Sequence, residues 1–205
     1  MTFWETIEWG EYVMFALALI VLACLIILWV RSASLSRNKK RTKLLMQKVR
    51  DYIMEGDVDN ARQLSGDTAT SGGRLVATGL SKMGEPLSEV KDTMKETSEI
   101  EKEKMASGLR WLHTMAVVAP LLGLGGTLVG IIDRLRDLGD SGAAADISAV
   151  CGAIAPTIVT TVAGLVVGIL ALVCQTILEG VIARARIGLE EVKEEFIGLL
   201  NEPAV

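Results

Sequence analysis

The stretch Ala119-Pro-Leu-Leu-Gly-Leu-Gly-Gly-Thr-Leu-Val-Gly130 decides the fold of this chain. A second stretch of the same kind follows, Ala153-Ile-Ala-Pro-Thr-Ile-Val-Thr-Thr-Val-Ala-Gly-Leu-Val-Val-Gly168. Both are apolar, contain no acid or base, and are rich in glycine, alanine and threonine. In lipid the hydrophobic effect does not hold helices together, so close backbone approach and hydroxyl contacts must do so. The two stretches therefore predict membrane helices built to pack against other helices.

The composition places the chain among membrane proteins that also carry a large water-exposed part. Half of its 205 residues are hydrophobic, yet 22% are charged. The net charge of −4 favours no class of partner. The three cysteines form no CxxC pair, and His113 has no Cys or Glu arranged around it, so we expect no metal site and no cofactor. The sequence contains no phosphate-binding glycine loop and no nucleophile motif, and we do not expect an enzyme.

Residues 12–30 are uncharged and predict the first membrane helix, since about 20 apolar residues span a bilayer. A cleaved signal peptide is the alternative, but it would begin with bases, whereas Glu5 and Glu8 precede this run. Eight bases follow between Arg31 and Arg50. The positive-inside rule then puts residues 1–11 outside and the following segment in the cytoplasm. Nucleic-acid binding is the alternative for these bases; their place beside a membrane helix favours topology and lipid headgroup contact.

The remaining segments follow from the same pattern of charge and hydropathy. Residues 31–110 predict a cytoplasmic helical domain, which begins as an amphipathic extension of the first helix, includes a loop over residues 65–73 and starts a new helix at Pro86. Residues 111–132 predict the second membrane helix, 133–147 an outer loop, 148–178 the third membrane helix, and 179–205 a cytoplasmic C-terminal helix and tail. The predicted fold is all-α, with three spans, the N-terminus outside and the C-terminus in the cytoplasm.

Small and hydroxyl-bearing residues recur on one face of the second and third membrane helices. Spacings of three and four residues place such residues on one stripe. The stripe of the third helix contains Thr157, Thr161, Gly164 and Gly168, and that of the second contains Gly123, Thr127 and Gly130. Gly126–Gly130 and Gly164–Gly168 are also GxxxG pairs, which favour helix packing. A threonine in a membrane helix also commonly bonds to its own backbone. The stripes could pack within one subunit, or several subunits could arrange them around something central.

No Asp, Glu, Lys or Arg lies deep within any of the three predicted spans. A protein that carries protons by side-chain titration needs an acid or a histidine inside the membrane. If this chain conducts protons, a partner must therefore supply the titrating group. A secondary transporter is disfavoured, because the chain has neither an inverted repeat nor a charge at mid-depth.

The two stretches resemble the signatures of the ExbB/TolQ/MotA proton-channel family. The run from Ala119 to Ile132 is similar to its second-helix pattern APxxGLxGTVxGI, and the run from Thr160 to Ile169 is similar to its third-helix pattern xTxxGLxxAI. The three-span layout with the N-terminus outside resembles ExbB and TolQ more than MotA, which has four spans.

The resemblance implies a pentameric ring in the bacterial inner membrane. Its second and third helices would line a pore that holds the single membrane helices of an ExbD/TolR-like partner, whose aspartate takes up and releases the proton. The family's pore threonines match Thr127 and Thr161, and Thr157 lies on the same stripe. Proton flow would then drive TonB-type uptake or Tol-type envelope work through a TonB/TolA-like protein.

The chain departs from the family pattern at two places. Pro156 stands where ExbB commonly has a glutamate, and Ile169-Leu170 stands where the family usually continues to Ile-Pro. These departures predict that a helix kink has moved to Pro156. Asp133, at the outer end of the second helix, is a candidate replacement for the missing polar group. The sequence thus favours a proton-driven motor subunit, and a purely structural oligomeric scaffold is the alternative.

Overall fold

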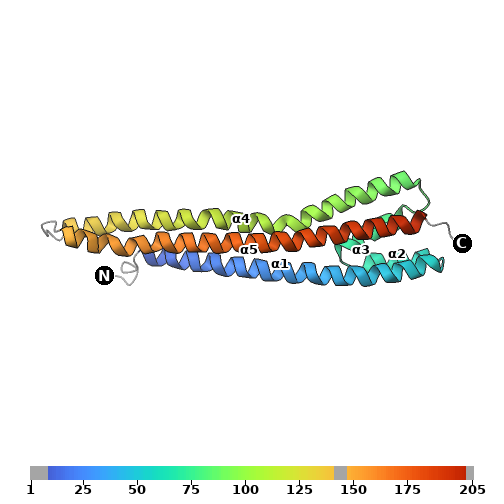
Figure 1. The fold of residues 1–205 in the computed structure, drawn as a ribbon, viewed down its shortest axis with the longest axis horizontal. Coiled ribbons are helices and arrows are strands. Elements are labelled where there is room, and N and C mark those ends of the chain that lie inside the picture. Colours follow the sequence, from blue (N-terminus) through green and yellow to red (C-terminus); the bar gives the residue numbers. More distant parts are fainter. Residues whose placement is uncertain (1–8, 141–146, 202–205) are drawn as a thin grey trace. The chain divides into compact units, whose positions relative to one another are not determined.

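The computed structural model describes residues 9–140 and 147–201, and these residues form five helices (Figure 1). Their bounds are α1 Trp9–Met54, α2 Val58–Asp67, α3 Ser71–Ser81, α4 Leu87–Asp140 and α5 Ile147–Asn201. Helices α1, α4 and α5 are long and apolar enough to cross a membrane. No strand occurs in the described ranges. The predicted all-α class with three long membrane-type helices is confirmed.

The long helices contribute to two compact units. The first, which we call the membrane unit, contains the described parts of residues 1–29 and 109–177. The second, which we call the polar unit, contains those of residues 30–108 and 178–205. Helix α4 continues to Asp140, through the first part of the segment expected as an outer loop. Residues 141–146 of that segment lie outside the described residues.

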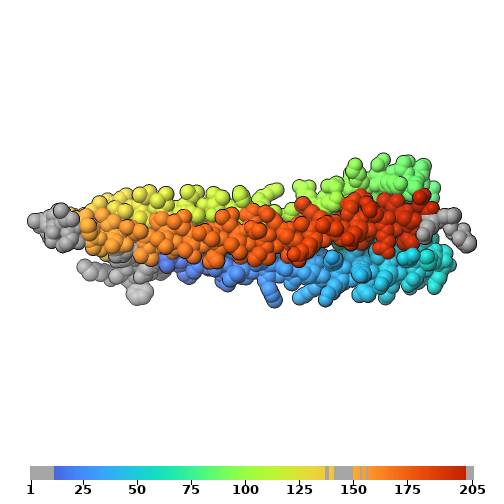
Figure 2. Space-filling view, in the orientation of Figure 1, coloured from blue at the N-terminus to red at the C-terminus, as the bar shows by residue number. Residues whose placement is uncertain are grey.

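All three long helices meet in the membrane unit. Leu17 of α1, Ala119 of α4 and Val167 of α5 form one buried cluster, and Val13 and Ala163 pack against it. On the face drawn in Figure 2, α5 (orange) lies between α4 (yellow) and α1 (blue) in this unit. The outward sides remain strongly apolar; they include Phe15, Leu121 and Ile169, each more than half exposed. Lipid or further membrane helices would cover such surfaces.

The polar unit has a conventional apolar core. Phe196 of α5 is fully buried, together with Val49 of α1, Leu75 of α3 and Met94 of α4. The side chain of Asp57 caps α2 by accepting from the backbone N–H of Asn60. The core explains why helices that are polar on their outer sides stay folded, because each buries one apolar stripe.

The loop predicted over residues 65–73 is wrong for most of its length. Helix α2 continues to Asp67, and α3 begins at Ser71. Thr70 caps α3, its hydroxyl accepting from the Gly73 N–H at 3.0 Å. The small residues that suggest a loop serve close packing instead, since a Cβ on Gly72 would collide with the side chain of Thr42 on α1. The helix predicted at Pro86 is confirmed, because α4 begins at Leu87.

Candidate functional site

Two glycines bring the backbones of α4 and α5 into direct contact. A Cβ built on Gly123 would lie 2.7 Å from the carbonyl oxygen of Thr160 and 2.9 Å from the Cα of Gly164. A Cβ on Gly164 would lie 2.8 Å from the carbonyl oxygen of Ala119. No real Cβ tolerates such distances, so larger residues at either position would push the helices apart. The glycine stripes therefore face each other within one chain.

The other glycines singled out from the sequence lie against neighbouring helices too. Gly168 faces the ring of Pro120, with Pro120 Cγ 2.7 Å from the position of an added Cβ. A Cβ added to Gly130 would lie 3.0 Å from the methyl group of Thr157, and one added to Gly126 would lie 2.9 Å from a methyl group of Val13 on α1. Gly123, Gly130, Gly164 and Gly168 thus line the α4–α5 contact, whereas Gly126 lies at the contact between α4 and α1.

Beside the glycine contact, threonine hydroxyls and backbone carbonyls form a compact oxygen cluster. The Thr127 Oγ1 lies 3.0 Å from the Gly123 carbonyl oxygen, 3.1 Å from that of Thr157 and 3.0 Å from the Thr160 Oγ1. It also contacts the Thr161 Oγ1. Thr161 in turn donates towards the Gly123 carbonyl at 3.3 Å. We call these three hydroxyls, of Thr127, Thr160 and Thr161, with the two carbonyls the threonine cluster.

The members of the cluster differ in exposure. Thr127 is 8% exposed and Thr160 is 5% exposed, whereas Thr161 is half-buried. The Thr157 hydroxyl donates to the carbonyl of Ile154 at 2.7 Å, so Thr157 joins the cluster through its carbonyl and not its hydroxyl. Thr161 is therefore the member best placed to meet a group outside the chain.

Thr160 was not predicted as a site residue, although it is central to this arrangement. Its hydroxyl donates to the Thr157 carbonyl at 2.7 Å and lies 3.0 Å from the Thr127 Oγ1. The signal for it was the Thr160-Thr161 pair itself. Two adjacent threonines point about 100° apart on a helix. The Thr127 hydroxyl of α4 contacts the hydroxyls of both Thr160 and Thr161.

The chemistry available to the cluster is hydrogen-bond exchange without any change of charge. A hydroxyl has one proton to donate and two lone pairs that accept. Thr127 can therefore donate to only one of its close acceptors at a time. When its proton changes acceptor, the hydroxyls of Thr160 and Thr161 must reorient as well. Such a group can donate to a carboxylate or accept from a protonated one, but it cannot store a proton at neutral pH.

The remaining sequence candidates lie elsewhere on the same two helices. Asp133 lies on α4 beyond Gly130 and is half-buried. Pro156 lies within the helical range of α5, and α5 continues through Ile169 and Leu170. The kink at Pro156 stays a prediction. Within residues 9–140 and 147–201, no three His, Cys, Asp or Glu side chains gather as a metal site would require.

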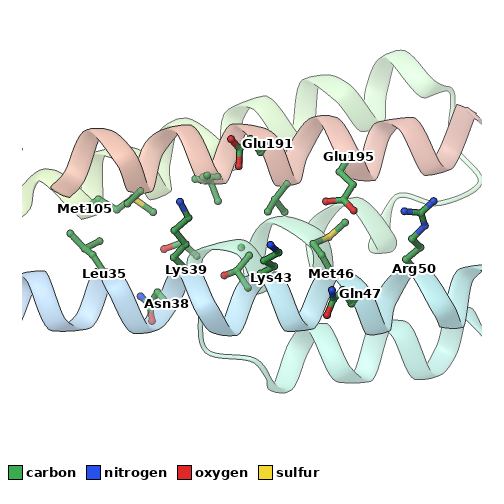
Figure 3. A pocket seen from close by; sticks show the side chains of 17 residues that line it. Leu35, Asn38, Lys39, Lys43, Met46, Gln47, Arg50, Met105, Glu191 and Glu195 are labelled. Carbon is green, nitrogen blue, oxygen red and sulfur yellow. The ribbon is translucent and has the colours of Figure 1, made fainter. Parts of the chain in front are cut away.

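A cavity of about 430 Å³ lies in the polar unit between α1 and α5 (Figure 3). Its lining includes the buried apolar side chains of Leu35, Met46 and Met105. It also includes the charged side chains of Lys39, Lys43 and Arg50 from α1 and of Glu191 and Glu195 from α5. This mixture of apolar and oppositely charged side chains shows no arrangement of a nucleophile with a base.

A buried acid ties the helices of the polar unit together. Glu101 of α4 is 2% exposed and accepts two hydrogen bonds from the Arg74 guanidinium of α3, at 3.0 and 2.8 Å. Lys104 donates to it at 2.8 Å. Burial by itself raises the pKa of Glu101, but the hydrogen bonds from Arg74, Lys104 and Ser71 outweigh burial and lower its pKa to about 2. Glu101 is therefore a charged structural anchor and not a proton carrier at neutral pH.

Comparison with known proteins agrees with these features. Residues 67–191, more than half of the 205-residue chain, match the model of the MotA/TolQ/ExbB proton channel family. A protein of Methanothermobacter thermautotrophicus named as an ExbB homolog is 41% identical over 83 residues, which are 40% of this chain and 29% of that protein. A protein of Synechocystis sp. named ExbB-like 1 is 31% identical over 167 residues, which are 80% of this chain and 65% of that protein.

The chain thus spans less than two thirds of either relative's length. The family match includes α4 and the greater part of α5, and with them the glycine contact and the threonine cluster. The resemblance found in the two glycine- and threonine-rich stretches is confirmed. This membrane protein belongs to the MotA/TolQ/ExbB proton channel family.

Proposed function

We propose that the chain is the ring-forming subunit of a proton-driven motor in the bacterial inner membrane. Several copies, five by analogy with the family, would surround the membrane helices of an ExbD/TolR-like partner that carries an acid. Proton passage past that acid would move the partner relative to the ring and do work on the cell envelope, of the TonB-type or the Tol-type. The N-terminus would lie outside and the polar unit in the cytoplasm, as the bases between Arg31 and Arg50 favour.

The threonine cluster is the observation that carries this proposal. It gathers polar atoms in an otherwise apolar helix pair, yet contains no group that titrates at neutral pH. A hydroxyl that can both donate and accept stabilises the charged and the neutral form of a carboxyl group in turn. Thr161, the half-buried member, would contact the partner's acid. Thr127 and Thr160 would hold the Thr161 hydroxyl within the cluster.

Replacement of one hydroxyl by a methyl group tests the proposal. Thr161→Val retains the shape of the side chain but removes its proton and lone pairs. We expect proton flux through the complex with the partner to fall about tenfold or more, because one charge-assisted hydrogen bond is worth about 1.5–3 kcal/mol. Thr176→Val on the same helix is the matched control, since Thr176 is exposed and donates to the Leu172 carbonyl of its own helix at 3.0 Å. Equal flux in both variants would remove Thr161 from the pathway.

A structural scaffold without ion coupling is the second candidate, and one observation favours it. The glycines of α4 and α5 and the hydroxyls of Thr127 and Thr160 are already engaged within a single chain. Helix packing alone accounts for these contacts. Retention of full function in a Thr161→Val variant that assembles normally would support the scaffold.

A further inference from the structure

Two charged stripes of opposite sign lie on different helices of the polar unit. The basic stripe consists of Arg37, Arg41, Leu44 and Lys48 on α1, and the acidic stripe consists of Asp92, Glu96, Glu99 and Glu103 on α4. In each, successive members are separated by four, three and four residues, so each stripe occupies one face of its helix. All eight side chains are exposed.

Most charged side chains of the two stripes form no ion pair with another described residue. Among the described residues, Arg37, Arg41 and Lys48 form no ion pair, and neither do Asp92, Glu96 and Glu103. Glu99 pairs with Lys102 at 2.8 Å, and Lys102 also reaches Glu190 at 3.0 Å. Lys95 and Arg186 border the acidic stripe and reduce its net charge. The stripe nevertheless presents three acids that form no ion pair with residues 9–140 or 147–201.

An exposed apolar side chain lies within the basic stripe and another lies beside the acidic stripe, each next to a groove. Leu44 is 61% exposed and borders a groove whose other wall is the end of α2, at Leu64 and Thr68. Ile100 is 48% exposed and borders a groove between α4 and α5 together with the acids. Single exposed apolar residues are common on protein surfaces. What distinguishes the two stripes is therefore their charges, which are opposite in sign and follow the same spacing.

The two stripes lie at the same level of the polar unit. The Arg31 guanidinium of α1 donates to the Ser107 hydroxyl of α4 at 2.8 Å, which gives both helices a common starting point. At about 1.5 Å per residue, Arg37 and Arg41 lie about 9 and 15 Å along α1 from that point. Counted back along α4, Glu103 and Glu99 lie about 6 and 12 Å from it. Two copies of the polar unit lying side by side could therefore bring the stripes together with a small offset along the helices.

We infer that the basic stripe on α1 of one copy binds the acidic stripe on α4 of the next copy. Because the two surfaces differ, the contact is head-to-tail and can close into a ring. The inference rests on the ring assembly proposed above and names the surfaces that set its register. Exposed ion pairs contribute little affinity each, so the stripes fix orientation and exclude wrong pairings, while apolar contacts supply most of the association.

Anionic lipid is the other partner that the basic stripe could meet. The headgroup layer extends only about 5–8 Å beyond the hydrocarbon core on each side. Lys48 lies about 26 Å along α1 from Arg31, well past such a layer. Lipid also leaves the acidic stripe unexplained. A neighbouring copy accounts for both stripes at once.

Charge exchange between the stripes tests the inference on the full-length chain. Arg37→Glu with Arg41→Glu reverses the basic stripe, and Glu96→Lys with Glu103→Lys reverses the acidic stripe. We expect each double variant to lower the assembled fraction at least tenfold, measured by light scattering in detergent at low salt. The combined four-residue variant should restore assembly to within about twofold of the original, because opposite charges face each other again. That restoration also shows that the double variants do not merely misfold.

Glu55→Lys with Glu194→Lys is the matched control, because both acids are exposed and lie outside the stripes. It should assemble like the original chain. The inferred contact is wrong if either double variant assembles like the original chain, or if the combined variant does not regain the assembled fraction of the original. A loss confined to the Arg37 and Arg41 variant, and seen only in nanodiscs containing phosphatidylglycerol, would assign the basic stripe to lipid instead. A monomeric unmodified chain would overturn the ring itself, which separates failure of the proposed function from failure of this contact.

Discussion

Gly123 of α4 and Gly164 of α5 touch backbone to backbone, so that a Cβ on Gly164 would lie 2.8 Å from the Gly123 Cα. This contact sets how closely the two helices approach. It also sets the distance from Thr127 to the hydroxyls of Thr160 and Thr161, because all of these residues lie within one or two turns of it. The helix packing and the threonine cluster are therefore one structural feature.

Gly164→Ala should destabilise the membrane unit by about 1–3 kcal/mol, since a methyl group there overpacks a rigid backbone contact. Thermal unfolding of the purified protein in detergent measures the effect. Gly125→Ala is the control on α4, because an added Cβ at Gly125 meets nothing within 4 Å. A Gly164→Ala protein as stable as the Gly125→Ala protein would contradict the close approach.

Thr127→Val should cost about 1–3 kcal/mol of stability, because it leaves neighbouring polar groups of the buried cluster without a partner. Thr127→Ser keeps the hydroxyl and should recover most of that loss. Chemical denaturation of both variants in the same detergent provides the comparison. Similar losses in the two variants would mean that the methyl group, and not the hydrogen bonding, is what the site requires.

The stability of the polar unit should fall in acid as Glu101 becomes protonated. Its pKa is lowered from the ordinary 4.5 to about 2 in the folded chain, so between these values the unfolded chain binds more protons than the folded one. Stability is fully present above about pH 4.5 and is lost progressively down to about pH 2, by up to about 3 kcal/mol. The free energy of unfolding of the original protein, measured between about pH 2 and pH 4.5, should therefore rise with pH.

Glu101→Gln should remove that component of the pH dependence and lower stability at neutral pH, because Arg74 and Lys104 lose a charged acceptor. Glu194→Gln, at an exposed acid of α5, should leave the acid slope unchanged. An unaltered slope in Glu101→Gln would assign the acid sensitivity to other carboxylates.

Phe196→Ala should destabilise the polar unit by about 3–5 kcal/mol, because Phe196 is fully buried and packs against Gly79 of α3. Hydrogen exchange should accelerate in α2 and α3 in particular. Ile187→Ala on the same helix should have little effect, since Ile187 is 60% exposed. Equal protection of α2 and α3 from hydrogen exchange in both variants would show that Phe196 of α5 does not stabilise this core.

The sequence predicted the helical class and the three membrane-type helices because long uncharged runs have few alternative structures. It also predicted that Gly123, Gly164 and the threonines share faces, since helical spacing determines a face. Spacing does not identify what the face touches, so the contact between Gly123 and Gly164 within one chain had to come from the structure. Thr160 was missed although it meets the same spacings, three residues after Thr157 and four before Gly164, because the stripe was drawn through the adjacent Thr161 instead.

Composition was misleading in the short helices of the polar unit. Ser71, Gly72 and Gly73 favour a loop by local preference, yet they begin α3. The close contact of Gly72 with Thr42 and the cap by Thr70 outweigh the low helix propensity of these residues. Local preference is a weak guide wherever small residues allow two helices to approach closely.

Proton uptake by liposomes tests most directly whether the titrating acid comes from a partner. The chain reconstituted alone should not conduct protons under an imposed pH gradient, and addition of an ExbD/TolR-like partner should start conduction. Changing the membrane aspartate of that partner to asparagine should stop it. Conduction by this chain alone, at the rate seen with the partner, would contradict the account.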